Sequence, residues 1–131
     1  MFDHLSLGVR SLADSRRFYD AILAPLGHGL AVDRETELAY GPDGRSALFF
    51  LYPVAGERVN GLGAHIAFAA TSREAVDAVY AAALAGGATA IRPAGAHPDI
   101  APDYYGTILL DPDGNKLEFV VSAEAGMPMA A

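Results

Sequence analysis

The chain has 131 residues, of which 52% are hydrophobic and 19% charged, and its formal net charge is −7. These values are typical of one folded domain, here residues 1–131, and exclude a disordered chain. The acidic excess argues against nucleic acid or an anionic membrane as a partner, and the absence of cysteine excludes disulfides and thiolate metal sites. No apolar run reaches the ~18 residues of a membrane span, and no signal-peptide pattern is visible, so we expect a cytoplasmic protein.

The first half of the chain predicts a strand, a helix and three further strands. Polar and apolar side chains alternate in the first segment, the second has apolar residues at helical spacing, and the later segments are short apolar runs between turn residues. In order, these elements span residues 3–9, 12–24, two short strands within 28–41, and 46–52. Ser11 is the expected N-cap of the helix, and Pro42-Asp43-Gly44 forms the turn before the last strand.

The second half predicts the same order of elements after a glycine-rich connection. In order, they span residues 64–70, a helix from Thr71 or Ser72 to Gly86, a short strand at 89–92, and a hairpin of 104–111 with 115–122. The proline-containing segment 93–103 is expected to be an irregular loop. The chain is therefore predicted to be an α+β fold with a mixed or antiparallel sheet, built from two βαβββ modules at about 1–55 and 62–123.

An internal repeat relates the two modules. Three residues of the first module recur 61 positions later, in the pairs His4 and His65, Tyr19 and Tyr80, Leu23 and Leu84. Farther along the chain the offset is 70, because the turn at residues 42–44 matches Pro112-Asp113-Gly114. In the alignment of the two repeats, this offset makes Leu48 the counterpart of Glu118. Each module thus carries one strand histidine, but only the second carries a carboxylate in its last strand. Two imidazoles and one carboxylate are the composition of a divalent-metal site.

Strand alternation places these candidate ligands on one face. His4, His65 and Glu118 each alternate with the apolar residues of their strand that face the helices, so their own side chains face away. If that face curls into a trough, the three side chains can converge on a metal. Iron, manganese, nickel, zinc and cobalt all remain open as its identity.

Other residues of the same face are expected to line the trough. These pocket residues are Ser6, Leu48, Phe50, Tyr52 and Ala67. One of Tyr104 and Tyr105 should also face the trough, and both are candidates for a catalytic group that hydrogen-bonds a substrate. His28 and His97 lie in edge or loop positions and are not predicted to be functional.

Four segments resemble the vicinal oxygen chelate superfamily, which includes glyoxalase I, bleomycin-resistance proteins, fosfomycin-resistance transferases and extradiol dioxygenases. The segments are residues 3–9, residues 15–19 with 26–27, residues 63–68 and, as the most specific, residues 110–118 with the sequence LDPDGNKLE. The resemblance implies an open, curved mixed sheet around a divalent metal held by His4, His65 and Glu118. It also implies a homodimer that shares the site between subunits.

The resemblance narrows the activity without naming a substrate. Glyoxalase I uses a fourth carboxylate at the position that the repeat gives to Leu48, so classical glyoxalase I activity is not expected. The remaining ligand set leaves coordination positions open for water, substrate or oxygen. We therefore expect a metal-dependent enzyme acting on a small oxygen-chelating substrate. The alternative is a metal-free module that sequesters an aromatic or cationic small molecule, for which the acidic charge and trough aromatics are suited.

Overall fold

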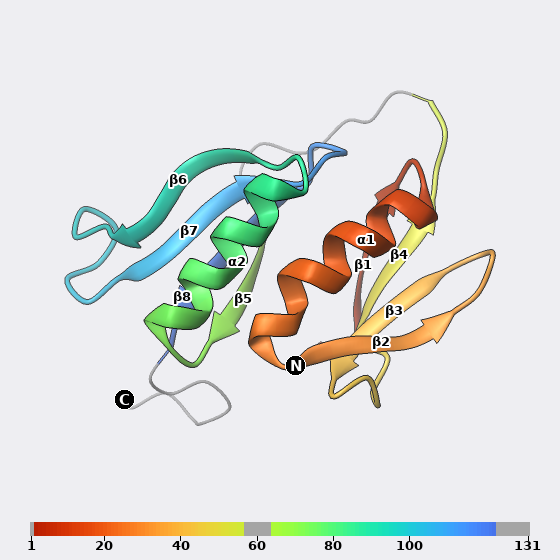
Figure 1. Ribbon diagram of the computed structural model, residues 1–131, viewed down its shortest axis with the longest axis horizontal. Helices are drawn as coiled ribbons and strands as arrows, with labels where there is room; N and C mark the ends of the chain where they lie inside the picture. The colour runs from red at the N-terminus through yellow and green to blue at the C-terminus, as the bar shows by residue number, and fades with distance from the viewer. Residues whose placement is uncertain (1, 57–63, 123–131) are drawn as a thin grey trace.

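The computed structural model describes residues 2–56 and 64–122, and each half of the chain forms a βαβββ module (Figure 1). The first module consists of β1 (Leu5–Val9), α1 (Leu12–Leu23), a 3-10 turn (Ala24–Leu26), β2 (His28–Asp33), β3 (Leu38–Pro42) and β4 (Phe49–Pro53). The second consists of β5 (Ile66–Ala70), α2 (Arg73–Ala85), β6 (Thr89–Ala96), β7 (Tyr105–Leu110) and β8 (Lys116–Val121). The prediction of an α+β fold with two βαβββ modules is confirmed. The predicted glycine-rich connection lies largely outside the described residues.

Each module has its own four-stranded mixed sheet, with strand orders β1-β4-β3-β2 and β5-β8-β7-β6. The first and last strands of each module pair in parallel, and the other neighbours are antiparallel. The two helices lie side by side in the middle of the molecule, each across its own sheet (Figure 1). No helix in the described ranges is long and apolar enough to cross a membrane.

The helices begin at serine caps and bury one face. The Ser11 hydroxyl accepts a hydrogen bond from the Asp14 amide, and the Ser72 hydroxyl accepts one from the Ala75 amide, which settles the choice between Thr71 and Ser72.

The core is continuous between modules, because Phe68 of β5 contacts aromatic rings from both sheets. Its ring centroid lies 5.2 Å from that of Phe49 and 5.1 Å from that of Phe119. The two modules therefore share one apolar interior.

Two strand boundaries differ from the prediction. β4 begins at Phe49 and not at residue 46. β6 continues to Ala96, through the segment that was predicted to be irregular from Pro93 onward. β6 is the edge strand of its sheet, and its register with β7 shifts between Arg92 and Gly95. Pro93 lies within this shift, so the N–H that proline lacks is not needed for pairing between the strands.

The Asp-Pro-Asp-Gly-Asn segment connects the two modules. Asp111 is 3% exposed, and its Oδ2 accepts hydrogen bonds from the Tyr19 hydroxyl at 2.6 Å and the Asn115 side-chain amide at 2.9 Å. Its Oδ1 accepts from the backbone amides of Asp113 and Asn115 at 2.9 and 2.7 Å. The side-chain amide of Asn115 also donates to the carbonyl of Gly8 at 3.1 Å. The segment therefore ties the β7–β8 turn to α1 and β1 of the other module.

His28, the first residue of β2, gives the fold a predicted pH dependence. Burial lowers the pKa of His28, and the Asp43 carboxylate acts in the opposite direction. Because folding disfavours the protonated imidazole, its contribution to stability is complete above the unfolded-state pKa of about 6.5 and is lost as the pH falls toward the lower folded-state pKa. We expect the urea midpoint to decrease between about pH 7 and about pH 5, with a flatter decrease for His28→Phe. Equal slopes for the two proteins would contradict this.

Candidate functional site

His65 and Glu118 meet on neighbouring strands of the second sheet. β5 and β8 are parallel with Ala67 opposite Glu118, and His65 immediately precedes β5. The His65 Nε2 lies 3.1 Å from the Glu118 Oε1, and the two side chains are 37% and 14% exposed. Because Leu117 and Phe119 on either side of Glu118 are fully buried in the core, the carboxylate lies on the opposite face, as predicted. A solvent-accessible imidazole and a partly buried carboxylate are thus adjacent.

Tyr104 holds the other oxygen of the same carboxylate. Its hydroxyl donates to Glu118 Oε2 at 2.7 Å, and the residue is 8% exposed. Burial, and then the hydrogen bond to Glu118, raise the pKa of Tyr104, so the phenol keeps its proton and remains a donor. Glu118 therefore has one oxygen fixed by Tyr104 and the other directed to His65.

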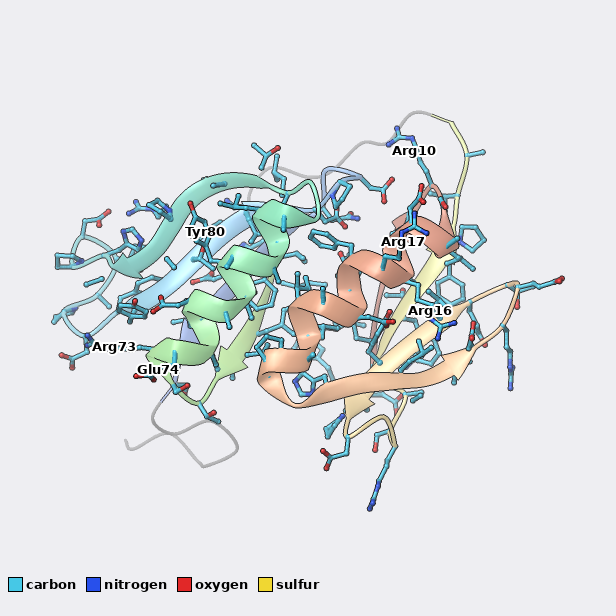
Figure 2. All side chains as sticks on the ribbon, viewed as in Figure 1. Arg10, Arg16, Arg17, Arg73, Glu74 and Tyr80 are labelled. Carbon is cyan, nitrogen blue, oxygen red and sulfur yellow. The ribbon has the colours of Figure 1, made fainter. Side chains whose placement is uncertain are left out.

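Tyr105 lies on the other side of the sheet. Its hydroxyl donates to the Asp77 carboxylate of α2 at 2.6 Å, and the Arg73 guanidinium lies 4.7 Å from its ring centroid. Figure 2 shows Arg73 and Glu74 at the first turn of α2. The Tyr105 ring lies under the Arg73 guanidinium. Of the two tyrosine candidates, Tyr104 is therefore the one beside the predicted ligands, and Tyr105 joins its sheet to a helix.

β6 and the segment after it add residues that were not predicted to be functional. The His97 ring centroid lies 5.8 Å from that of Tyr104, and the His97 Nε2 lies 2.8 Å from the Pro93 carbonyl oxygen. Arg92 makes a two-pronged contact with Asp99 at 3.1 and 2.8 Å. The register pairs Arg92 with Ile108, and Ile108 with Glu118, so Arg92 shares the carboxylate's face. The position of Arg92 on the same face as Glu118 follows only from this cross-strand register.

His4 immediately precedes β1 of the other sheet, apart from this pair. Its side chain is 51% exposed, its Nδ1 lies 2.6 Å from the Asp3 carboxylate, and its ring is edge-on to Phe50 at 5.3 Å. Within residues 2–56 and 64–122, no three His, Cys, Asp or Glu side chains are close enough together to hold a metal. A single chain thus brings together His65 and Glu118 but not His4.

The strand register corrects the predicted counterpart of Glu118. Ser6 pairs with Phe50 in the first module, as Ala67 pairs with Glu118 in the second, so Phe50 occupies the equivalent position. Leu48 lies before β4 and is 45% exposed. The first module has two more residues between its turn and this position than the second, which the 70-residue offset did not include. The equivalent position is thus an aromatic residue and not a carboxylate. The ring of His4 lies edge-on to this Phe50 ring.

The remaining predicted pocket residues divide between the sheets. Ala67 lies beside Glu118, whereas Ser6, Phe50 and Tyr52 belong to the first sheet. The rings of Phe50 and Tyr52 are stacked, with centroids 6.0 Å apart and an interplanar angle of 8°. Tyr52 is 37% exposed, so this aromatic pair presents surface to solvent.

The sequence matches the family model of the Glyoxalase/Bleomycin resistance protein/Dioxygenase superfamily over residues 1–119. The chain belongs to this superfamily. A glyoxalase/bleomycin resistance protein from Albidiferax ferrireducens, whose crystal structure is known, is 35% identical with a TM-score of 0.80, and the match covers 93% of this chain and 99% of that one. The superfamily assignment is thus supported over nearly the whole length.

More distant superfamily structures show the same fold. A glyoxalase-related enzyme from Fulvimarina pelagi is 21% identical with a TM-score of 0.69, over 98% of this chain and 91% of that one. The fosfomycin resistance protein FosX from Listeria monocytogenes is 19% identical with a TM-score of 0.67, over 94% and 93%. The curated proteins contain no significant match.

Proposed function

We propose that this protein is a divalent-metal-dependent enzyme that acts on a small substrate chelating through neighbouring oxygens, and that His4, His65 and Glu118 hold the metal. The observation that carries the proposal is the contact of His65 with one oxygen of Glu118 while Tyr104 binds the other. A metal-ligand carboxylate is ordinarily held in this way by an outer hydrogen bond.

The donor atoms fit a divalent cation. Imidazole nitrogen and carboxylate oxygen suit iron, manganese, nickel, zinc and cobalt. Ligand distances of about 2.0–2.2 Å set neighbouring donors of one ion about 3 Å apart, and the His65 Nε2 and Glu118 Oε1 are separated by 3.1 Å. A bound cation would supply Lewis acidity, which polarises an oxygen of the substrate. Tyr104, which stays protonated, would orient the carboxylate.

The third ligand requires a second subunit. We propose a homodimer in which His4 of one copy meets His65 and Glu118 of the other. Support comes from the half-exposed ring of His4 and from exposed apolar side chains of the same module. These are Phe2 at 75% exposure, Leu48 at 45%, Val54 at 41% and Tyr52 at 37%. Exposed apolar residues in such number suit an interface between copies.

A second candidate function is metal-free binding of an aromatic or cationic small molecule. The stacked Phe50 and Tyr52 rings favour it, because an exposed aromatic pair on an acidic protein attracts flat or cationic ligands. In that case His65→Ala should leave ligand affinity nearly unchanged.

Metal content distinguishes directly between the metal-dependent enzyme and the metal-free binding protein. Protein purified without a histidine tag should contain near-stoichiometric iron, manganese, nickel, zinc or cobalt by elemental mass spectrometry, and His65→Ala and Glu118→Ala should remove it. Absence of metal after anaerobic loading with each ion would overturn the enzyme proposal and leave the binding function.

Tyr104→Phe tests the role of the outer hydrogen bond. The variant keeps the ring and removes only the hydroxyl that fixes Glu118 Oε2. We expect metal affinity to fall by about 10–100-fold, as for other outer-shell partners of metal ligands. Competition with a chelator measures it. The matched control is Tyr105→Phe, whose hydroxyl binds Asp77 on the helix side. Equal affinity losses in both variants would contradict a specific role for Tyr104.

A further inference from the structure

Lys116 is the only lysine of the chain, and it begins β8 two residues before Glu118. The residues on either side of it, Asn115 and Leu117, are buried at 5% and 0% exposure. Because strand residues alternate between faces, Lys116 faces the same side of the sheet as Glu118. Strand geometry sets the Cα atoms of these two residues about 7 Å apart. A flexible ammonium group thus belongs to the face that carries the candidate metal ligands.

In the sheet, Lys116 lies between His65 and an apolar residue. β5 and β8 are parallel with Ile66 opposite Leu117, so the preceding residues of the two chains, His65 and Lys116, are also neighbours. On the other side, the register pairs Lys116 with Leu110 of β7. Lys116 is partly exposed. Its side chain therefore starts beside a candidate ligand and stays reachable from solvent.

The Lys116 ammonium has no hydrogen bond or ion pair within residues 2–56 and 64–122, although the chain has 16 acidic and 9 basic residues. Arg92, which shares this face, is in contrast paired with both carboxylate oxygens of Asp99 at 3.1 and 2.8 Å. An ammonium that is partly withdrawn from water without a partner costs free energy, which an anion bound beside it would recover. Lys116 thus presents an uncompensated positive charge beside the candidate ligands.

We propose, as an extension that rests on the proposed function, that the substrate is a small anion whose chelating oxygens include a carboxylate, and that Lys116 pairs with this carboxylate. The negative charge must lie close to the chelating oxygens, because Lys116 starts beside His65 and about 7 Å from Glu118. A carboxylate offers one oxygen to a metal and the other to the ammonium, and charge-assisted hydrogen bonds of this kind are strong. Lys116 thereby favours anionic chelators over neutral diols and repels cations.

Calorimetric titration of the metal-loaded protein with oxalate, a small carboxylate with neighbouring oxygens, tests the proposal. Lys116→Met removes the charge, keeps an unbranched side chain and should weaken oxalate binding about tenfold. Lys116→Arg, which restores the charge, should recover most of the affinity. The matched control is Arg17→Met, which removes a cation from the exposed surface of α1 (Figure 2) and should leave oxalate affinity unchanged. Both methionine variants should keep the metal content of the parent.

Chemical labelling gives a second readout that does not require metal. Because Lys116 is the only lysine, acetylation with acetic anhydride and mass spectrometry of its peptide report its accessibility directly. Saturating oxalate should slow the acetylation of Lys116 several-fold. If the parent binds no metal, the proposed function fails, but slower acetylation by oxalate in that metal-free protein would still support an anion site at Lys116. Unchanged acetylation there would overturn the anion site as well.

Three results with metal-loaded protein would overturn the proposal. The first is no saturable binding of oxalate to the parent. The second is equal oxalate affinity in the parent and in Lys116→Met, which would leave the metal as the sole binding group. The third is loss of metal from a folded Lys116→Met variant, which would show that Lys116 supports the ligands and does not bind the substrate.

Discussion

Refolding a mixture of His4→Ala and Glu118→Ala subunits should restore about one quarter of the parent's metal content. In the proposed dimer each site takes His4 from one subunit and His65 and Glu118 from the other. Each variant alone breaks both sites. A mixed dimer has one site with both substitutions and one with none. Random association makes about half of the dimers mixed, with one of two sites intact in each, which gives the quarter.

The matched control is a mixture of His65→Ala and Glu118→Ala subunits. These residues belong to the same half of the site, 3.1 Å apart in one chain, so no mixed dimer regains a complete set. Elemental mass spectrometry after refolding and removal of free metal gives the readout. Absence of recovery in the first mixture would place the site within a single chain. Full metal content in His4→Ala alone would remove His4 from the ligand set.

The second large effect concerns stability. Asp111→Ala should lower the free energy of unfolding by about 3–5 kcal/mol, because it leaves the Tyr19 hydroxyl and the Asn115 amide without their buried acceptor. It also removes the acceptor for two backbone amides of the turn. The expected decrease in melting temperature is on the order of 10–15 °C for a domain of this size.

Two further variants separate the contact from the general effect of losing an aspartate. Asp103→Ala removes an exposed carboxylate and should change stability by less than about 0.5 kcal/mol. Tyr19→Phe should lower it by about 1–2 kcal/mol. In a double-mutant cycle, Tyr19→Phe and Asp111→Ala should be non-additive because the two groups are bonded. A change below about 1 kcal/mol in Asp111→Ala would show that the segment does not clamp the modules.

The helices and strands of each module were predicted well because caps and residue spacing depend only on neighbouring residues. The serine caps and helical spacing fixed α1 and α2, and the repeat fixed the βαβββ order. Pairing between strands depends on how many residues each turn contains, which periodicity does not encode. The sequence therefore misplaced the counterpart of Glu118 at Leu48, where the register has Phe50. β6 was expected to end before Pro93 for another reason, because proline usually interrupts a strand, but an edge strand such as β6 tolerates it.

The candidate site was predictable in its faces but not in its distances. Alternation put His65 and Glu118 on one side of the second sheet, and the structure has them in contact. The same rule put His4 on the equivalent face of the first sheet, but equivalent faces of two sheets need not meet within one chain. The roles of Tyr104 and Tyr105 differ because adjacent strand residues face opposite sides, and only the contacts with Glu118 and Asp77 reveal which is which.

The clamp at Asp111 affects how similarity to this chain should be interpreted. The most recognisable segment, LDPDGNKLE, begins with residues that hold the modules together, Asp111 and Asn115, and ends with the proposed ligand Glu118. A homologue that preserves the first part and replaces the final glutamate would keep the residues that hold the modules together and lack the proposed metal ligand. Similarity in the first part of this signature therefore indicates a shared architecture, whereas a test of the proposed metal site depends on its last position.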